Sequence, residues 1–251
     1  MRRFTDVLVS AAGLIALWAL LVELADLPPY MLPSPWRVAR VFWTDHATLW
    51  LNAGMTIWES LAGFALGSAA GISAGIALMT SSLARRWLGP FLVLSQSVPT
   101  FALAPLIVLW LGFGPESKIV VAAIGIYFVV ASNFYDGLRR ADPGLLDMAR
   151  VMGASRSTEL WRIRIPAALP ALGSGLKVAA AYAPIAAAVG EWAGASKGLG
   201  YLMLYANARL KIDLMFAALL TLAVFGLVFH ALVGWAARRL TSWAPEARQD
   251  P

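Results

Sequence analysis

Six long apolar stretches, separated by polar segments, restrict the possible folds of this chain more than any other feature. They occupy about residues 7–24, 60–79, 91–111, 119–135, 167–190 and 214–237. A helix needs roughly 20 apolar residues to cross a bilayer. The sequence therefore predicts an all-α integral membrane protein with six transmembrane helices, forming one membrane domain over residues 1–251.

Composition supports this class and argues against several others. Of the 251 residues, 60% are hydrophobic and 14% are charged, against about 25% charged residues in soluble domains. Cysteine is absent, which excludes disulfides, thiolate nucleophiles and cysteine–metal sites. No His, Asp and Glu cluster has metal-ligand spacing, and Ser95, Ser97 and Ser132 have no evident base partner nearby in the sequence. We expect no catalytic residue, no metal, no cofactor and no nucleic-acid partner.

The distribution of Lys and Arg predicts the orientation. With the N-terminus inside, the inner segments (1–6, 80–90, 136–166 and 238–251) hold 13 basic residues. The outer segments (25–59, 112–118 and 191–213) hold 6, with Lys177 inside a span left uncounted. Inner loops of membrane proteins carry the excess of Lys and Arg. Both termini and the 136–166 loop are therefore expected in the cytoplasm.

The second span carries glycines at every fourth position, namely Gly63, Gly67, Gly71 and Gly75. Small residues at this spacing share one helix face and let a neighbouring backbone approach closely. We interpret this stripe as a packing surface rather than a ligand site. Before this span, Ser34 and Pro35 have the pattern of a helix start, which predicts an amphipathic helix lying at the outer membrane surface.

The 136–166 loop has the signals of two short helices. Asp142 is a favourable N-cap and Pro143 suits the first helical position. Gly153 is a natural residue just past a helix end, and Ser155 is a cap for a second helix that Pro166 is expected to close. The apolar positions of the first helix share one face: Leu145, Met148, Ala149 and Met152.

That apolar face must be buried, since a short amphipathic helix is marginal alone in water. It packs either on its own membrane domain or in a groove of another protein. Composition leaves these two possibilities even.

The spacing within this loop resembles the EAA loop of ABC-importer permeases, which reads Glu-Ala-Ala, three residues, Gly, nine residues, Ile-x-Leu-Pro. Four positions match: Ala149, Gly153, Ile163 and Pro166. Three differ, with Asp147 in place of Glu, Met148 in place of Ala and Ile165 in place of Leu. The resemblance extends over about residues 32–240. Residues 99–114 and 190–201 are similar to nitrate/sulfonate/taurine-type permeases, and the stretch to 213–217 is most similar to permeases for pyrimidine precursors of thiamine.

The resemblance implies the type I ABC importer (MetI-like) permease fold and a function in ATP-driven import of a small polar solute across the bacterial inner membrane. The implied partners are a cytoplasmic ABC ATPase dimer that binds ATP and Mg²⁺, an extracytoplasmic solute-binding protein, a second permease copy in a homodimer, and membrane lipid. The residues implied to couple to the ATPase are Leu146, Asp147, Ala149, Arg150, Gly153, Ala154, Ser155, Ile163 and Pro166. The implied substrate is a hydroxymethylpyrimidine-type thiamine precursor, or a nitrate-, sulfonate- or taurine-like solute.

Five residues are candidates for the solute pathway or its gate. Pro99 interrupts the third span and frees carbonyl groups, or it simply bends the helix. Tyr127, Asn133 and Tyr182 are polar groups in apolar spans, and such residues line a pore or pack between helices. Glu191 begins the outer loop that a binding protein would meet, which suggests contact or gating.

A stand-alone secondary transporter or channel is the alternative function, and a membrane enzyme or scaffold is a further one. Proton-coupled carriers bury carboxylates at mid-span and often repeat their halves. Here Asp and Glu are expected to avoid the span centres, and no repeat is visible. Transport that survives without an ATPase partner would distinguish the lone carrier.

Overall fold

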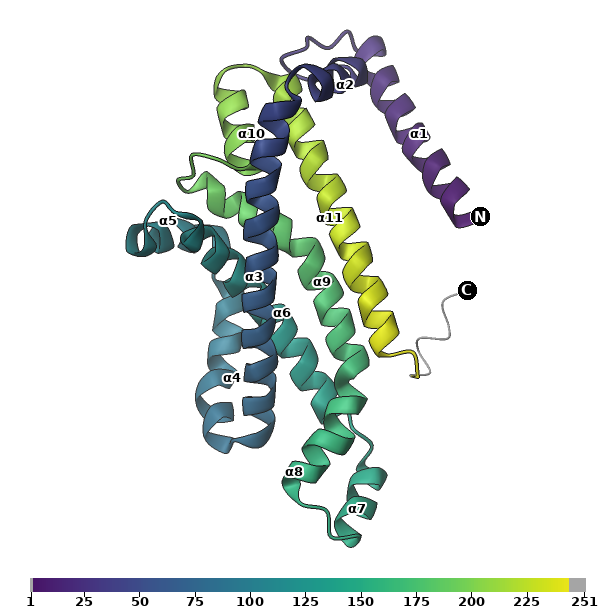
Figure 1. Cartoon of the computed structure of the whole chain (residues 1–251), viewed down its shortest axis with the longest axis vertical. Helices are drawn as coiled ribbons and strands as arrows, with labels where there is room; N and C mark the ends of the chain where they lie inside the picture. The colour runs from purple at the N-terminus through teal and green to yellow at the C-terminus, as the bar shows by residue number, and fades with distance from the viewer. Residues whose placement is uncertain (1, 244–251) are drawn as a thin grey trace.

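The molecule is an elongated set of helices with two long helices side by side at its centre (Figure 1). The computed structural model describes residues 2–243, and all of their side chains except those of residues 2–4, 6–8, 11, 91 and 93–97. Within the described part, four helical stretches are long and apolar enough to cross a membrane: α3 (His46–Thr80), α6 (Pro115–Arg139), the continuous stretch Arg156–Trp192 and α11 (Ile212–Leu240). The other helices are α1 (Arg2–Leu24), α2 (Pro35–Thr44), α4 (Ser82–Ser97), α5 (Thr100–Leu111), α7 (Pro143–Val151) and α10 (Leu199–Ala208).

The predicted glycine stripe forms a close helix contact between α3 and α6. A Cβ atom added to Gly67 would lie 2.6 Å from the carbonyl oxygen of Ala123, and one on Gly71 would lie 2.8 Å from that of Tyr127. Only glycine leaves room for the neighbouring backbone at these positions. The interpretation of the stripe as a packing surface is therefore confirmed.

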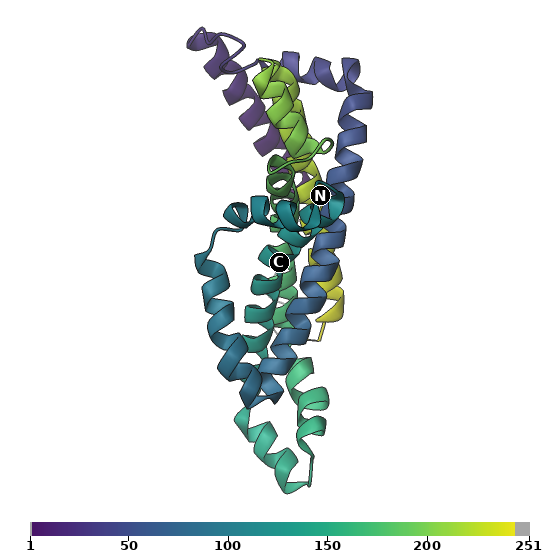
Figure 2. The same ribbon diagram turned by 90° about the vertical axis from the view of Figure 1, so that its left-hand side faces the viewer.

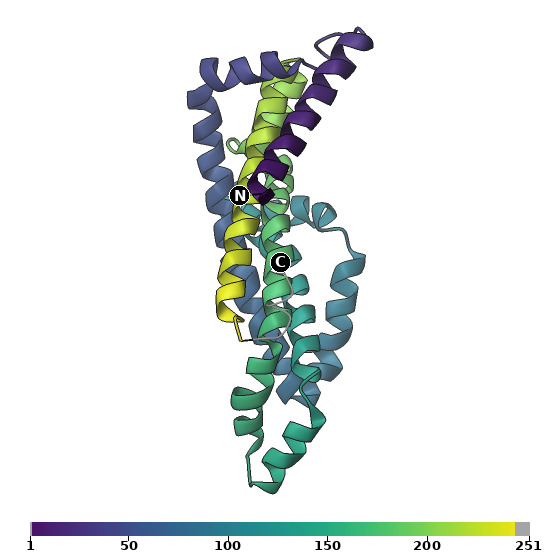
Figure 3. The same cartoon turned by 90° about the vertical axis from the view of Figure 1, so that its right-hand side faces the viewer.

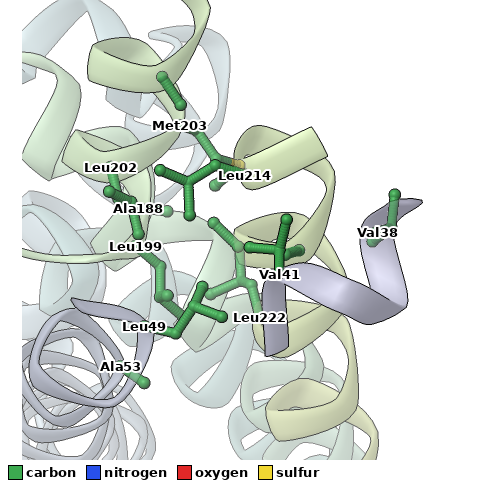
Figure 4. Close-up of a cluster of buried hydrophobic side chains, with 13 residues drawn as sticks. Val38, Val41, Leu49, Ala53, Ala188, Leu199, Leu202, Met203, Leu214 and Leu222 are labelled. Atoms are coloured by element: carbon green, nitrogen blue, oxygen red, sulfur yellow. The ribbon is translucent and has the colours of Figure 1, made fainter. Parts of the chain in front are cut away.

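One hydrophobic cluster joins five helices at the upper end of the molecule (Figure 4). Val38 and Val41 of α2 belong to it, together with side chains of α3, α9, α10 and α11. On the opposite face of α2, Trp36 and Trp43 are 72% and 86% exposed. This amphipathic helix begins after Ser34 with Pro35 in its first turn, as the sequence predicts.

The predicted third span, residues 91–111, is wrong as a single helix. α4 ends at Ser97 and α5 begins at Thr100, with Val98 in an extended conformation between them. Pro99 explains the break, because proline disfavours helical backbone in the residue before it. Figure 2 shows α4 standing apart from the long helices, with α5 crossing back towards them. Several α5 side chains are exposed, including Leu109 at 77% and Trp110 at 74%.

Pro166 does not close a helix, which corrects a second expectation. α8 (Arg156–Glu159), the π-helical turn η1 (Leu160–Arg164) and α9 (Ile165–Trp192) follow one another without interruption. A proline inside a helix lacks one N–H donor and collides with a preceding carbonyl. The wider π-helical turn immediately before Pro166 provides the local adjustment that lets the helix continue.

Candidate functional site

A hairpin made of α7 and α8 projects beyond the long helices at the lower end of the molecule (Figures 1 and 3). Asp142 caps α7 as expected, since its Oδ1 accepts a hydrogen bond of 2.7 Å from the backbone N–H of Gly144. Pro143 occupies the first turn of the helix. The described residues of the predicted loop therefore have the local structure that their capping signals indicate.

The turn between the two helices depends on backbone conformation at Gly153. Its φ is +83°, in the left-handed region that favours glycine, and a Cβ added there would meet no atom within 4 Å. The N–H of Gly153 donates to the Arg150 carbonyl, and the N–H of Ala154 donates to the Ala149 carbonyl, both at 2.9 Å. Ser155 then begins α8, with its hydroxyl oxygen accepting from the N–H of Thr158 at 3.2 Å.

Arg150 ties the two helices of the hairpin together. Its Nε donates to Oε1 of Glu159 at 2.9 Å, and its Nη1 donates to Oδ1 of Asp147 at 3.1 Å. The hydrogen bond to Glu159, followed by the attraction of that carboxylate, raises the pKa of the Arg150 guanidinium above its ordinary value. The Glu159 side chain is only 10% exposed, whereas that of Asp147 is 72% exposed. The pair with Glu159 therefore contributes more to the shape of the hairpin.

The apolar stripe of α7 is left uncovered by the described part of the chain. Leu145, Met148 and Met152 are 49%, 57% and 79% exposed, and only Leu146 is buried, at 6%. Of the two possibilities left open by composition, packing of the stripe on its own membrane domain does not occur here. Ala149, Ala154, Ile163 and Pro166 are half-buried around the hairpin.

The four predicted pathway residues other than Glu191 do not form one cluster. The Tyr182 hydroxyl lies 2.7 Å from the Thr100 hydroxyl, next to the helix break at Pro99, so these elements are brought together. Asn133 donates to the Val129 carbonyl of its own helix at 2.8 Å. Tyr127 packs against the cluster that contains Leu92. These contacts are compatible with helix packing, and a pathway role for Asn133 and Tyr127 stays a prediction.

Glu191 is buried and does not lie on a surface that a partner would meet. It is 1% exposed and belongs to the last turn of α9. Its Oε1 accepts from the Thr56 hydroxyl at 2.6 Å, while its Oε2 accepts from the N–H groups of Gly200 and Tyr201 at 2.6 Å and 3.1 Å. The expectation of direct contact with a partner fails, and the observed role is to fasten the start of α10 to α3.

Further buried polar side chains make hydrogen bonds to the backbone near Glu191, and they were not identified as buried from the sequence. Lys118, which is 1% exposed, donates to the carbonyls of Phe113 and Gly194 at 2.9 Å and 3.0 Å. Asn52 Oδ1 accepts from the N–H of Gly198 at 2.8 Å. Glu59 is also 1% exposed, and its Oε2 has no hydrogen-bond partner among the described residues. We call Asn52, Thr56, Glu59, Lys118 and Glu191 the upper polar cluster.

The sequence contained a signal for this cluster. Asn52, Thr56 and Glu59 follow one another at i, i+4 and i+7, on the face that continues into Gly63. Because α3 begins at His46 rather than at residue 60, these residues lie inside a helix and not in an outer loop. Glu59 is therefore a helical residue rather than a loop residue, while the expectation that acidic residues avoid the span centres stays a prediction.

Comparison with known families places most of the chain in one of them. Residues 67–242 match the family described as "Binding-protein-dependent transport system inner membrane component". The matched part includes the α7–α8 hairpin and the whole of α6, of the stretch Arg156–Trp192 and of α11.

Three curated relatives cover nearly the whole chain. A "Probable ABC transporter permease protein" of Haemophilus influenzae is 42% identical over 94% of this chain and 97% of its own length. The "Putative aliphatic sulfonates transport permease protein SsuC" of Escherichia coli is 31% identical over 93% of this chain and 89% of its own length. The "Formylaminopyrimidine transport permease protein ThiX" of Halalkalibacterium halodurans is 30% identical, over 92% of each chain.

The fold also has a match among solved structures. An inward-facing structure of the MetNI methionine ABC transporter has a chain that aligns with a TM-score of 0.63 over 80% of this chain and 98% of that chain, at 20% identity. The architecture is therefore that of the MetI-like type I importer permeases, as the resemblance in the sequence implied.

Proposed function

The chain belongs to the family of binding-protein-dependent transport system inner membrane components, and on that basis we propose that it forms the solute pathway of an ATP-driven importer and is driven through its α7–α8 hairpin. Members of this family are non-catalytic permease subunits of ABC importers, and they work with a separate ATPase and a binding protein. The chain is thus a multi-pass membrane protein that has a transport role.

The uncovered stripe of α7 is the single observation that carries the coupling proposal. Three large apolar side chains, Leu145, Met148 and Met152, stay exposed on a short helix that projects from the body. An amphipathic helix with such a face is suited to a groove in another protein. We assign that groove to the ATPase subunit, whose ATP-dependent closure would then move the hairpin. ATP and Mg²⁺ are bound by the partner, since this chain has no Gly-x-x-x-x-Gly-Lys-Ser/Thr sequence.

The orientation follows from the same assignment. A hairpin that meets a cytoplasmic ATPase lies inside the cell, which places both termini in the cytoplasm, in agreement with the 13 to 6 distribution of basic residues given above. The upper polar cluster and α2 then lie on the extracytoplasmic side, where the binding protein delivers the solute.

A second copy of the chain completes the pathway in this proposal. The α4–α5 arm stands apart from the long helices and exposes Phe101, Leu109, Trp110 and Phe113. These four side chains are 65–77% exposed, so the described part of the chain leaves them uncovered. A self-complementary homodimer is the simplest arrangement that covers it. The solute then passes between the copies, near the helix break at Pro99 and the Tyr182 hydroxyl.

For the solute we propose a hydroxymethylpyrimidine-type thiamine precursor, with sulfonate- or taurine-like solutes as the second candidate class. The relatives named for formylaminopyrimidine and for aliphatic sulfonates are 30% and 31% identical to this chain. The aromatic ring of Tyr182, next to the break, suits a flat ring and favours the first class. Competition for uptake of a labelled pyrimidine precursor by unlabelled precursor, and not by taurine, would distinguish the two.

The test of the coupling proposal compares two substitutions at one position. Gly153→Val places a β-branched residue at φ +83°, whereas Gly153→Asn places there the residue that best tolerates this region after glycine. Because a Cβ at this position meets no atom within 4 Å, tolerance of the left-handed backbone is the main structural difference between the two changes. We expect Gly153→Val to lose the co-purifying ATPase subunit in mild detergent, and Gly153→Asn to retain it.

The controls are membrane insertion and the elution volume of the permease, which both variants should leave unchanged. Wild-type recovery of the ATPase and wild-type uptake in Gly153→Val would refute the coupling assignment. Uptake by preparations that contain no ATPase would instead support the alternative of a stand-alone secondary transporter.

A further inference from the structure

A polar pocket lies where the hairpin meets the lower ends of α3 and α4. Its volume is about 650 Å³, and nine residues line it: Met79, Thr80, Arg85, Arg150, Arg156, Ser157, Glu159, Leu160 and Arg164. These residues come from five elements: α3, α4, α7, α8 and η1. The pocket is separate from the uncovered stripe of α7, whose exposed residues do not line it.

The lining carries four arginines and one carboxylate. Glu159 is already paired with Arg150, which leaves the charge of the other three arginines unbalanced. Arg164 donates through Nη1 to the Leu138 carbonyl at 3.1 Å, which fixes its position without neutralising it. Both ion pairs found in residues 2–243 involve Arg150, so Arg85 and Arg156 face the pocket without a carboxylate partner there. The pocket is built to receive an anion.

The position of the pocket along the long helices is that of a membrane surface. Met79 and Thr80 are the last two residues of α3, and Leu160 to Arg164 lead into α9. Trp87, two residues after Arg85, is 71% exposed, and Trp161, next to Leu160, is 60% exposed. Exposed tryptophans are enriched at the level of the lipid headgroups. The pocket therefore opens where headgroup phosphates lie.

From these observations we infer that the pocket binds the phosphate-bearing headgroup of an anionic membrane lipid. The guanidinium groups of Arg85 and Arg156 match the phosphate oxygens in geometry and charge, and the Ser157 hydroxyl adds a donor. Met79 and Leu160 form an apolar edge that would contact the lipid acyl chains where they join the glycerol. Basic pockets between membrane helices on the cytoplasmic side bind such headgroups. The choice of the inner leaflet rests on the orientation proposed above.

An acidic surface of the ATPase is a different kind of partner for the same charges. The apolar edge and the two flanking tryptophans favour the lipid, because both features belong to the membrane surface and not to a groove in a soluble protein. A lipid in this pocket would touch the end of α3, the start of α4 and the hairpin at once, and so would hold the hairpin at a fixed angle to the body.

The experiment measures lipid binding to the delipidated full-length permease by native mass spectrometry, with phosphatidylglycerol, phosphatidylcholine and inorganic phosphate as probes. Arg85→Gln/Arg156→Gln removes two cations from the pocket. Arg140→Gln/Arg162→Gln is the matched control, since it removes two exposed cations of the same loop that do not line the pocket. A basic residue near an anionic headgroup contributes roughly a fivefold gain in affinity, so the pocket variant should bind phosphatidylglycerol about 30-fold more weakly.

The expected result is a loss of phosphatidylglycerol binding in the pocket variant alone, with phosphatidylcholine binding equal in all three proteins. Equal weakening in both double variants, or no preference for phosphatidylglycerol over phosphatidylcholine, overturns the inference. Inorganic phosphate that binds as tightly as the lipid reassigns the pocket to a free anion. Unchanged lipid binding with loss of the ATPase subunit reassigns it to the ATPase. Since lipid is counted on the permease itself, the result does not depend on the Gly153 test.

Discussion

The contact between α3 and α6 predicts a large cost for two methyl groups. In Gly67→Ala/Gly71→Ala, each new Cβ would meet a backbone carbonyl oxygen, at 2.6 Å and 2.8 Å. Ordinary contact begins at 3.4 Å, so the two helices must separate by up to 0.8 Å along this face. Backbone atoms cannot rotate away as a side chain can, and the separation loosens the buried contacts of Ile126 and Val130.

The magnitude follows from two opposing effects. Overpacking of a well-packed interface costs about 1–3 kcal/mol per site, and contact with backbone places both sites in the upper half of that range, at about 4–6 kcal/mol together. Alanine favours helix over glycine by at most about 1 kcal/mol at each position, which offsets about 2 kcal/mol. The expected net loss is therefore about 2–4 kcal/mol.

Gly54→Ala is the matched control for this experiment. Gly54 lies on the same helix, and a Cβ added there would meet no atom within 4 Å, so only the gain in helix propensity remains. Reversible unfolding of the purified permease by SDS in mixed micelles gives the free energies of unfolding. A double variant as stable as Gly54→Ala would refute the reasoning, because it would mean that α3 and α6 do not approach each other as closely as the glycines allow.

Two more predictions concern the two ends of the molecule. Thr56→Val should lower the free energy of unfolding by about 1–3 kcal/mol and reduce uptake, because it removes the hydroxyl that donates to Glu191 inside the upper polar cluster. The control is Thr221→Val, whose hydroxyl donates only to a carbonyl of its own helix and which should have little effect in the same SDS titration. Equal losses of stability in the two variants would contradict the prediction. Glu159→Gln should reduce recovery of the ATPase subunit, because it removes the charge of the buried carboxylate that pairs with Arg150. Asp147→Asn, at the exposed carboxylate that pairs with Arg150, should change recovery little. The reverse order would show that the exposed pair controls the hairpin.

Local signals predicted the hairpin well because each of them acts over a few residues. Asp142, Pro143, Gly153 and Ser155 all have the roles that capping rules assign to them. The packing face of the glycine stripe was equally predictable, since small residues at a period of four residues share one face of a helix. These features depend on backbone geometry that neighbouring residues decide.

The errors arose where tertiary contacts decide the outcome. Hydropathy places the start of the second span at residue 60, because Asn52, Thr56 and Glu59 are polar. Inside α3, Thr56 and Asn52 have buried partners in Glu191 and the N–H of Gly198. Pro166 was expected to end a helix, and the π-helical turn before it instead allows the helix to continue. Neither compensation is visible in a single stretch of sequence.

The continuous helical stretch Arg156–Trp192 gives the two ends of the molecule a physical connection. It spans 37 residues, or about 55 Å at 1.5 Å per residue. Its lower end carries Glu159, which holds α7 through Arg150, and its upper end carries Glu191, which holds the start of α10. The π-helical turn and the internal prolines at 170 and 184 can absorb part of a displacement of the hairpin. The remainder of the displacement is transmitted along the helix to Glu191. Because the glycine stripe holds α3 against α6 between these ends, such a displacement changes the angle of this stretch relative to that pair, which is the kind of rigid-body motion that alternating access requires.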